Sequence, residues 1–155
     1  MKLLIVGATG LVGRHVLEKA LANTEIESIV APGRRALASH PTLISPIVDF
    51  DYLPEEEDWQ EADAVICTLG TTIKVAGSQA AFRRVDHDYV VATARISRQH
   101  GTPTFVLTSA IGADVGPRFF YNRVKGKGSC RVRFYIPDIR PAGSYRRKTG
   151  SGKAA

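Results

Sequence analysis

Cysteine, tryptophan and long apolar runs are scarce in this chain of 155 residues. Its two cysteines, Cys67 and Cys130, are too few for a disulfide framework or a cysteine-based metal site, so we expect reduced thiols and a cytoplasmic protein. No apolar run approaches the length of a membrane-spanning helix, and residues 3–6 are too short a run to be a signal peptide. A hydrophobic content of 44% then fits one globular domain with a substantial core.

Acidic residues are nearly absent from the last part of the chain. Residues 1–122 carry 11 Lys and Arg against 14 Asp and Glu, whereas residues 123–155 carry 10 against one acid, Asp138. A basic segment can attract nucleic acid, but no aromatic-interleaved binding motif accompanies it, so we rank that role last. Because residues 144–155 have almost no apolar content, we expect a disordered basic tail after a domain formed by residues 1–143.

Three glycines follow an apolar stretch at the amino terminus. Gly7, Gly10 and Gly13 come directly after residues 2–6, an expected strand, and residues 11–23 have apolar positions close to a helical period. A strand, a glycine turn and a helix in this order form a dinucleotide-binding fingerprint; the alternative is a glycine-rich turn without a ligand.

Each glycine of the fingerprint has an expected task. Gly7 allows the sharp turn, Gly10 lets the backbone approach a pyrophosphate, and Gly13 lets the helix pack closely on the strand. The N–H groups at the helix start then hold the phosphates. The residues assigned to cofactor binding in this turn are Gly7, Thr9, Gly10, Leu11, Val12 and Gly13.

Strand and helix signals alternate along the rest of the chain. Further strands are expected at residues 26–31, 42–50, 63–69 and 104–108. Helices are expected at residues 78–99 and from residue 119 to 126. This alternation predicts an α/β fold: a doubly wound parallel sheet of the Rossmann type with right-handed crossovers.

The pattern weakens after Lys127. Gly126 and Gly128 make a poor helix interior, since each glycine costs about 1 kcal/mol relative to alanine. Residues 131–136 alternate charged and apolar side chains in the manner of an edge strand. We therefore expect the last helix to end early and the carboxyl-terminal strands to be incomplete.

The expected second strand ends without an acidic residue. An acid at this position accepts from the ribose 2′-hydroxyl and selects NAD, whereas an arginine accommodates a 2′-phosphate. Here the strand is followed by Arg34 and Arg35, whose planar guanidinium groups suit phosphate oxygens. This favours NADP(H) over NAD(H), with a solvated arginine loop as the alternative.

The next two strands end at the same edge of the sheet, where ligands bind in doubly wound folds. Asp49 is placed to accept from the adenine amino group, and Gly70 lets the backbone approach the ribose. A turn role for Asp49 and a core position for Cys67 are equally compatible with the sequence. The residues assigned to the cofactor at these strand ends are Asp49, Phe50, Cys67, Thr68, Leu69 and Gly70.

A tyrosine and a lysine four residues apart form a second chemical motif. Tyr121 and Lys125 lie on one helical face. A free phenol is a poor base at neutral pH, and an ammonium group beside it favours the phenolate, so the pair can exchange a proton with a carbonyl or hydroxyl as hydride moves. Ser109, at the end of the strand at 104–108, can bond the same substrate oxygen.

Taken together, the glycines, Ser109, Tyr121 and Lys125 resemble the short-chain dehydrogenase/reductase superfamily in its extended or atypical branch. A closer similarity, to the Tat-interacting-protein (metastasis-suppressor-type) oxidoreductases and their bacterial relatives, covers roughly residues 1–127. Its motifs are residues 67–72, 76–78, 85–89 and 121–126. The resemblance implies NADPH held by the glycines and the arginine, and a catalytic Ser109, Tyr121 and Lys125, with Lys125 also reaching the nicotinamide ribose.

The carboxyl-terminal part departs from that family. Residues 127–131 interrupt the tyrosine–lysine helix, and residues 140–143 resemble the family's Arg-Pro-Gly step but come too early. A frameshift, a truncation or an engineered end would each give this pattern. With the usual wall of the substrate pocket missing, we expect cofactor binding with weak or undetectable carbonyl reduction.

The sequence therefore predicts an NADP(H)-binding protein that resembles an oxidoreductase acting on a small-molecule carbonyl or alcohol. The alternatives are an NADP(H)-sensing regulatory protein without turnover and a truncated inactive product. A protein partner or a homodimer is left open, and neither a membrane nor a metal is expected. The acidic run at residues 55–58 reads as a solvated face, because consecutive carboxylates do not converge on one helical face.

Overall fold

The computed structural model describes residues 1–116, 119–135 and 140–141, with the backbone alone for residues 133–135 and 140–141. The described strands are β1 (Lys2–Val6), β2 (Ser28–Val30), β3 (Leu43–Ile44), β4 (Ala64–Cys67), β5 (Thr104–Leu107) and β6 (Arg140–Pro141). The described α-helices are α1 (Leu11–Leu21), α2 (Ile73–Ala76), α3 (Gln79–Arg83), α4 (Tyr89–Gln99) and α5 (Phe120–Tyr135). The expected tail at residues 144–155 lies outside the described residues.

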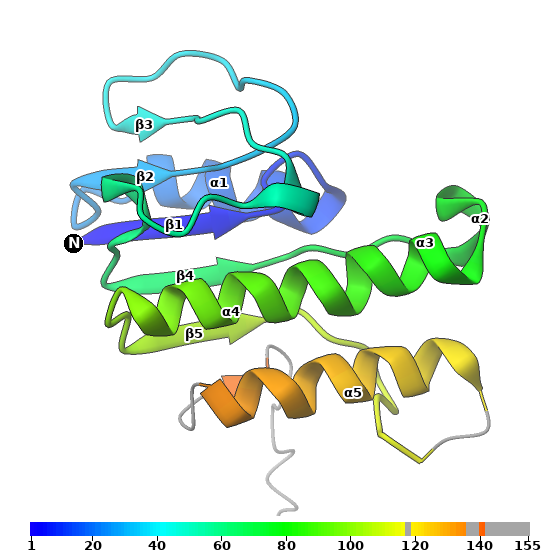
Figure 1. Cartoon of the computed structure of the whole chain (residues 1–155). Coiled ribbons are helices and arrows are strands. Elements are labelled where there is room, and N and C mark those ends of the chain that lie inside the picture. Colours follow the sequence, from blue (N-terminus) through cyan, green and yellow to red (C-terminus); the bar gives the residue numbers. More distant parts are fainter. Residues whose placement is uncertain (117–118, 136–139, 142–155) are drawn as a thin grey trace, which may run out of the picture.

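The described strands form one parallel sheet in the order β3-β2-β1-β4-β5-β6. The order reverses at β1, whose neighbours are β2 on one side and β4 on the other, as in a doubly wound sheet. Figure 1 shows α1 behind the strands and α4 in front of them. The predicted Rossmann-type fold is confirmed.

Alternating side chains of β1 supply the two halves of the core. Leu3 and Ile5 are buried on the face that α1 covers through Leu17. Leu4 and Val6 are buried on the other face, in the same cluster as Val90 of α4 and Val132 of α5. A strand buried on both faces needs a continuous apolar run, which explains why residues 3–6 are all apolar.

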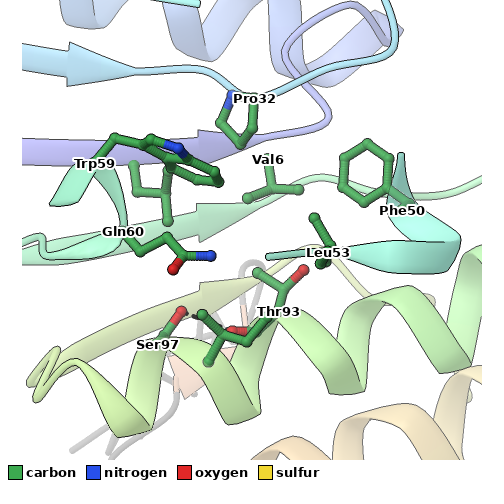
Figure 2. A pocket seen from close by; sticks show the side chains of 10 residues that line it. Val6, Pro32, Phe50, Leu53, Trp59, Gln60, Thr93 and Ser97 are labelled. Atoms are coloured by element: carbon green, nitrogen blue, oxygen red, sulfur yellow. Dashed lines mark hydrogen bonds between the residues drawn. The ribbon is translucent and has the colours of Figure 1, made fainter. Parts of the chain in front are cut away.

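A small apolar cavity lies between the sheet and α4, beneath the segment that crosses from β3 to β4 (Figure 2). The cavity measures ≈ 20 Å³, room for about one water molecule. Phe50 and Trp59 lie on either side of Val6, and α4 contributes Thr93 and Ser97. Both hydroxyls donate to carbonyls of their own helix, at Tyr89 and Thr93, so their hydrogen-bonding needs are met without a ligand.

Two expected elements are shorter or more broken than the sequence indicates. The strand expected at residues 42–50 is only Leu43–Ile44, because Pro46 cannot donate to a ladder, and Phe50–Tyr52 forms a 3₁₀ turn instead. The helix expected at residues 78–99 contains a π-helical turn at Arg84–Asp88 between α3 and α4. Turns of this kind often occur at functional sites.

The expectation of an early end to the last helix is wrong. Helix α5 continues to Tyr135, and the predicted edge strand at residues 131–136 is helical as far as it is described. A Cβ atom on Gly126 would overlap the backbone of Asp114, and one on Gly128 would lie 3.2 Å from the Asp86 carbonyl oxygen. The glycines thus let α5 pack against neighbouring backbone, and this packing offsets their low helix propensity.

The end of the sheet also differs from the expectation. Arg140 and Pro141 form β6, which pairs in parallel with Val106 and Leu107 of β5. The segment that seemed to come too early for a sixth strand therefore occupies the position of one. Only a short connection is needed because α5 runs back along the sheet before the chain reaches β6 (Figure 1).

Candidate cofactor and active site

The glycine turn, residues 7–13, has the conformation that its sequence predicts. Gly7 has a positive φ of 89°, and its carbonyl accepts from the amide of Gly10 at 2.9 Å. A Cβ on Gly13 would overlap the Gly7 carbonyl, so α1 can start this close to β1 only with glycine there. The hydroxyl of Thr68, at the end of β4, donates to the Val6 carbonyl and closes the turn from the neighbouring strand.

Beside this turn a cleft of ≈ 460 Å³ opens at the carboxyl edge of the sheet. Most of the residues assigned to the cofactor line it: Gly7, Thr9, Gly10, Arg34, Arg35, Phe50, Thr68, Leu69 and Gly70. Leu11 and Val12 follow in the first turn of α1, where both side chains are exposed and no side chain caps the helix. The backbone amides of this turn are available to an anion.

Two assigned residues lie differently from the others. The Asp49 carboxylate accepts from the amide of Asp51 at 2.9 Å and caps the 3₁₀ turn that carries Phe50. Cys67 is fully buried in the core, and burial raises the pKa of its thiol to about 12. Its side chain is therefore a neutral core group near neutral pH.

The loop after β2 presents Arg34 and Arg35 to the cleft. Gly33 fixes the start of this loop, because its amide donates to the Pro46 carbonyl at 3.0 Å and its carbonyl accepts from Val48 at 2.9 Å. Both arginines are exposed, and neither forms an ion pair with the described residues. Two guanidinium groups on an anchored loop suit an anion in the cleft.

Helix α5 brings the predicted chemical groups to the same edge of the sheet. The Tyr121 ring stacks on Phe82 with a centroid distance of 5.2 Å. One turn further on, the Lys125 ammonium lies 2.6 Å from a carboxylate oxygen of Asp86. The site that a Gly70 Cβ would occupy is only 3.2 Å from the Lys125 Nζ atom, so this lysine lies next to Gly70, a residue that lines the cleft.

Ser109 faces α5 one turn beyond Lys125. Its Oγ lies 3.0 Å from Oγ of Ser129, and the Ser129 hydroxyl donates to the Lys125 carbonyl at 3.0 Å. With that proton committed, the Ser109 hydroxyl is the donor to Ser129. Ser109 is thus connected to the lysine's helix through Ser129 rather than through a direct bond to Tyr121.

Sequence reasoning missed Asp86 and Ser129. Asp86 stands beside His87 in a mostly polar run, and it is buried within the π-helical turn. His87 bonds to the exposed carboxylate of Asp88 at 2.7 Å. Spacing from Lys125 would have indicated Ser129, since residues four apart share a helical face.

No described helix has the length and apolarity to cross a membrane. Among the described residues there is also no group of three or more potential metal ligands.

A family model described as NAD(P)H-binding matches residues 7–130, from the glycine turn to the middle of α5. The chain belongs to this NAD(P)H-binding family. Its sequence is 35% identical over 133 residues to protein HTATIP2 of Rattus norvegicus, covering 83% of this chain and 54% of the relative. It is 34% identical over 131 residues to the mitochondrial protein FMP52 of Eremothecium gossypii, covering 81% and 57%.

These relatives confirm the resemblance to the Tat-interacting-protein oxidoreductases and correct one expectation. The chain spans little more than half the length of the curated relatives. The expected cytoplasmic location is wrong by this comparison, because the FMP52 proteins are named mitochondrial. Low cysteine content separates oxidising from reducing compartments and does not distinguish one reducing compartment from another.

Solved structures support the same fold. MoeE5 in complex with UDP-glucuronic acid and NAD matches with a TM-score of 0.73 and 19% identity, covering 87% of this chain and 49% of that one. The oxidoreductase ylbE of Lactococcus lactis matches with a TM-score of 0.69 and 23% identity, covering 91% and 67%. At these identities the likeness concerns the fold.

Proposed function

We propose that this chain is the NADP(H)-binding part of an oxidoreductase that interconverts a small-molecule carbonyl and alcohol. The observation that carries the proposal is the position of Lys125, whose ammonium group lies next to Gly70, a residue that lines the cleft. The tyrosine-bearing helix thereby brings a lysine close to the cleft beside the glycine turn. The names HTATIP2 and FMP52 state no reaction, so the reaction rests on these residues.

The cleft fits a dinucleotide with a 2′-phosphate. The glycine turn offers backbone amides without a Cβ in the way, which suits a pyrophosphate. Arg34 and Arg35 stand where β2 leads into the loop, and no acid is present there to accept from a 2′-hydroxyl. We therefore propose a preference for NADPH over NADH.

Tyr121 would exchange the proton with the substrate. NADPH, when bound, supplies a hydride to the carbonyl carbon. The Tyr121 hydroxyl donates its proton to the carbonyl oxygen, so that an alcohol leaves and a phenolate remains next to the Lys125 ammonium. Ser109 orients the same oxygen, once its hydroxyl turns from Ser129 to the substrate. Phe82, stacked on the Tyr121 ring, limits the directions in which the phenol can point.

The cofactor preference is tested by titration calorimetry with NADPH and NADH. Replacing Arg34 with Ala should cost about 1.5–3 kcal/mol of NADPH binding, as the loss of hydrogen bonds to a charged group, and little of NADH binding. Arg98→Ala is the matched control, because Arg98 is exposed in the last turn of α4 and is not among the residues that line the cleft. Equal affinities for the two cofactors in the unchanged chain would contradict the preference.

The reaction is tested by NADPH oxidation with a panel of aldehydes, ketones and quinones. The continuous helix around Tyr121 and Lys125 removes one reason for the weak turnover that the sequence predicts, and the prediction itself stays open to this assay. Tyr121→Phe should abolish any turnover and leave NADPH affinity within about twofold, since it removes only the hydroxyl. NADPH binding without turnover on any substrate would favour an NADP(H)-sensing protein.

A further inference from the structure

The Lys125 ammonium is held by a carboxylate that has no place in the reaction described above. Asp86 lies in the π-helical turn Arg84–Asp88, and its side chain is completely buried. One carboxylate oxygen lies 2.6 Å from the Lys125 Nζ atom. The other accepts from the backbone amide of Thr71 at 2.9 Å. Asp86 thus joins three segments: the π-helical turn, helix α5 and the loop after β4.

A buried ion pair is a weak source of stability. Removing both charges from water is costly, and apolar side chains of similar size often do as well or better. The Lys125 side chain is only 9% exposed, so the pair bears most of that cost. A buried carboxylate does fix the orientation of the lysine side chain, because it selects one rotamer of a long, flexible lysine.

The residues around Asp86 pack closely enough to hold its carboxylate in place beside Lys125. A Cβ on Gly128 would press on the Asp86 carbonyl oxygen at 3.2 Å, so α5 rests directly on the π-helical turn. A Cβ on Gly70 would lie 3.5 Å from the Asp86 carboxylate and 3.2 Å from the ammonium. Gly70 itself lines the cleft, so the charged ends of Asp86 and Lys125 lie next to a cleft residue.

We propose that Asp86 is a positioning residue that fixes the Lys125 ammonium beside Gly70, a residue that lines the cleft. The inference rests on the proposed function, in which Lys125 serves the cofactor and Tyr121. Asp86 acts only through Lys125 and does not touch the reacting atoms. The π-helical turn carries Asp86 and therefore determines where its carboxylate meets the Lys125 ammonium.

A double-mutant cycle tests whether Asp86 acts through Lys125. NADPH affinity is measured by calorimetry for the unchanged chain, Asp86→Asn, Lys125→Met and the double variant, at a temperature where circular dichroism shows all four folded. Asparagine keeps the volume and can still accept from Thr71, so the variant removes mainly the charge. Asp86→Asn should weaken NADPH binding about tenfold when Lys125 is present and less than twofold when it is Met. Asp88→Asn, on the same turn but half exposed, should stay within twofold of the unchanged chain.

A second measurement does not depend on the cofactor. Nitrogen-15 NMR of lysine ammonium groups should show a slowly exchanging Lys125 signal, assigned by its absence in Lys125→Met. That signal should be lost in Asp86→Asn and kept in Asp88→Asn. If the unchanged chain fails to bind NADPH, the proposed function fails, and the ammonium signal still decides whether Asp86 fixes Lys125.

Two results would overturn the inference. One is an equal loss of NADPH affinity from Asp86→Asn with and without Lys125, which would make Asp86 a structural residue. The other is a slowly exchanging Lys125 signal that persists in Asp86→Asn.

Discussion

The glycine turn and helix α5 both depend on glycines that admit a neighbouring backbone, yet only the first reveals this in its sequence. Gly13 in α1 approaches the Gly7 carbonyl, a contact made six residues away. Gly126 in α5 approaches Asp114, and Gly128 approaches Asp86, on an element packed from elsewhere in the fold. Gly13 and Gly7 belong to one local motif that the sequence reveals. The partner of Gly128 lies far away along the chain and can be identified only from the folded structure.

The difference shows when helix propensity is a reliable guide. A glycine inside a solvent-exposed helix costs about 1 kcal/mol relative to alanine. Gly126 and Gly128 are buried, so a side chain there would press α5 away from Asp114 at the first position and from the π-helical turn at the second. Propensity thus favours alanine at these positions and packing favours glycine, and packing decides the structure.

The largest expected contrast between the two regions concerns their cysteines. Cys67 ends β4 beside the glycine turn and is buried, whereas Cys130 is exposed on α5. Burial raises the pKa of the Cys67 thiol from 9.0 to about 12, which lowers its reactive thiolate fraction near pH 8 by about a thousandfold. Alkylation at pH 8, followed by mass spectrometry, should modify Cys130 alone in the folded chain and both residues in denaturant.

Removing the lysine of the buried ion pair should cause the largest loss of stability in α5. Lys125→Met leaves the Asp86 carboxylate buried and unpaired, which should lower the free energy of unfolding by about 3–5 kcal/mol. Lys127→Met changes an exposed lysine of the same helix and should stay within about 0.5 kcal/mol. Urea denaturation measures both. A loss of the same size in the two variants would mean that the buried Lys125 contributes no more to the free energy of unfolding than an exposed lysine does.

Alanine at the buried glycines tests the comparison directly. Gly13→Ala and Gly126→Ala should each lower the free energy of unfolding by about 1–3 kcal/mol, because the new methyl group meets backbone atoms that cannot move aside. Gly116→Ala, where no atom of the described residues lies within 4 Å of the added Cβ, should change it by less than about 0.5 kcal/mol. If Gly126→Ala were more stable than the unchanged chain, helix propensity would outweigh packing in α5. Thermal and urea unfolding show whether the free energy of unfolding rises or falls.

The smallest expected effect concerns the serine pair that connects β5 to α5. Ser129→Ala removes the acceptor of the Ser109 hydroxyl, and should cost about 0.5–1.5 kcal/mol of stability, the usual net value of one hydrogen bond. Ser109→Ala should cost a similar amount, and the double variant little more than either. Additive losses in urea denaturation would show that the two hydroxyls do not depend on each other.

Local sequence patterns predicted the part of the site that lies within one chain segment. The turn at Gly7, the exposed loop of Arg34 and Arg35, and the spacing of Tyr121 and Lys125 each follow from residues adjacent along the chain or along a helix. The order of strands and helices is predictable for the same reason, because hydrophobic periodicity is a property of short segments.

The remaining features arise from contacts between distant segments. Asp86 pairs with Lys125 across 39 positions of the numbering, and nothing in the sequence of the run Val85 to Asp88 distinguishes it from the exposed Asp88. The continuation of α5 beyond Gly126 depends likewise on backbone that belongs to other elements. Local patterns cannot reveal which polar residue will be buried, because burial is a property of the assembled fold.

The hydroxyl of Thr68 has a consequence for how the protein folds. It donates to the Val6 carbonyl across a separation of 62 residues, and it lies where Cβ atoms at Gly7 and Gly13 would be. The glycine turn is therefore completed by a long-range contact, and such contacts form slowly because a large loop must close first. During synthesis, the amino-terminal strand and helix emerge well before their cofactor site can take shape. The chain gains the ability to bind a dinucleotide only when β4 reaches β1.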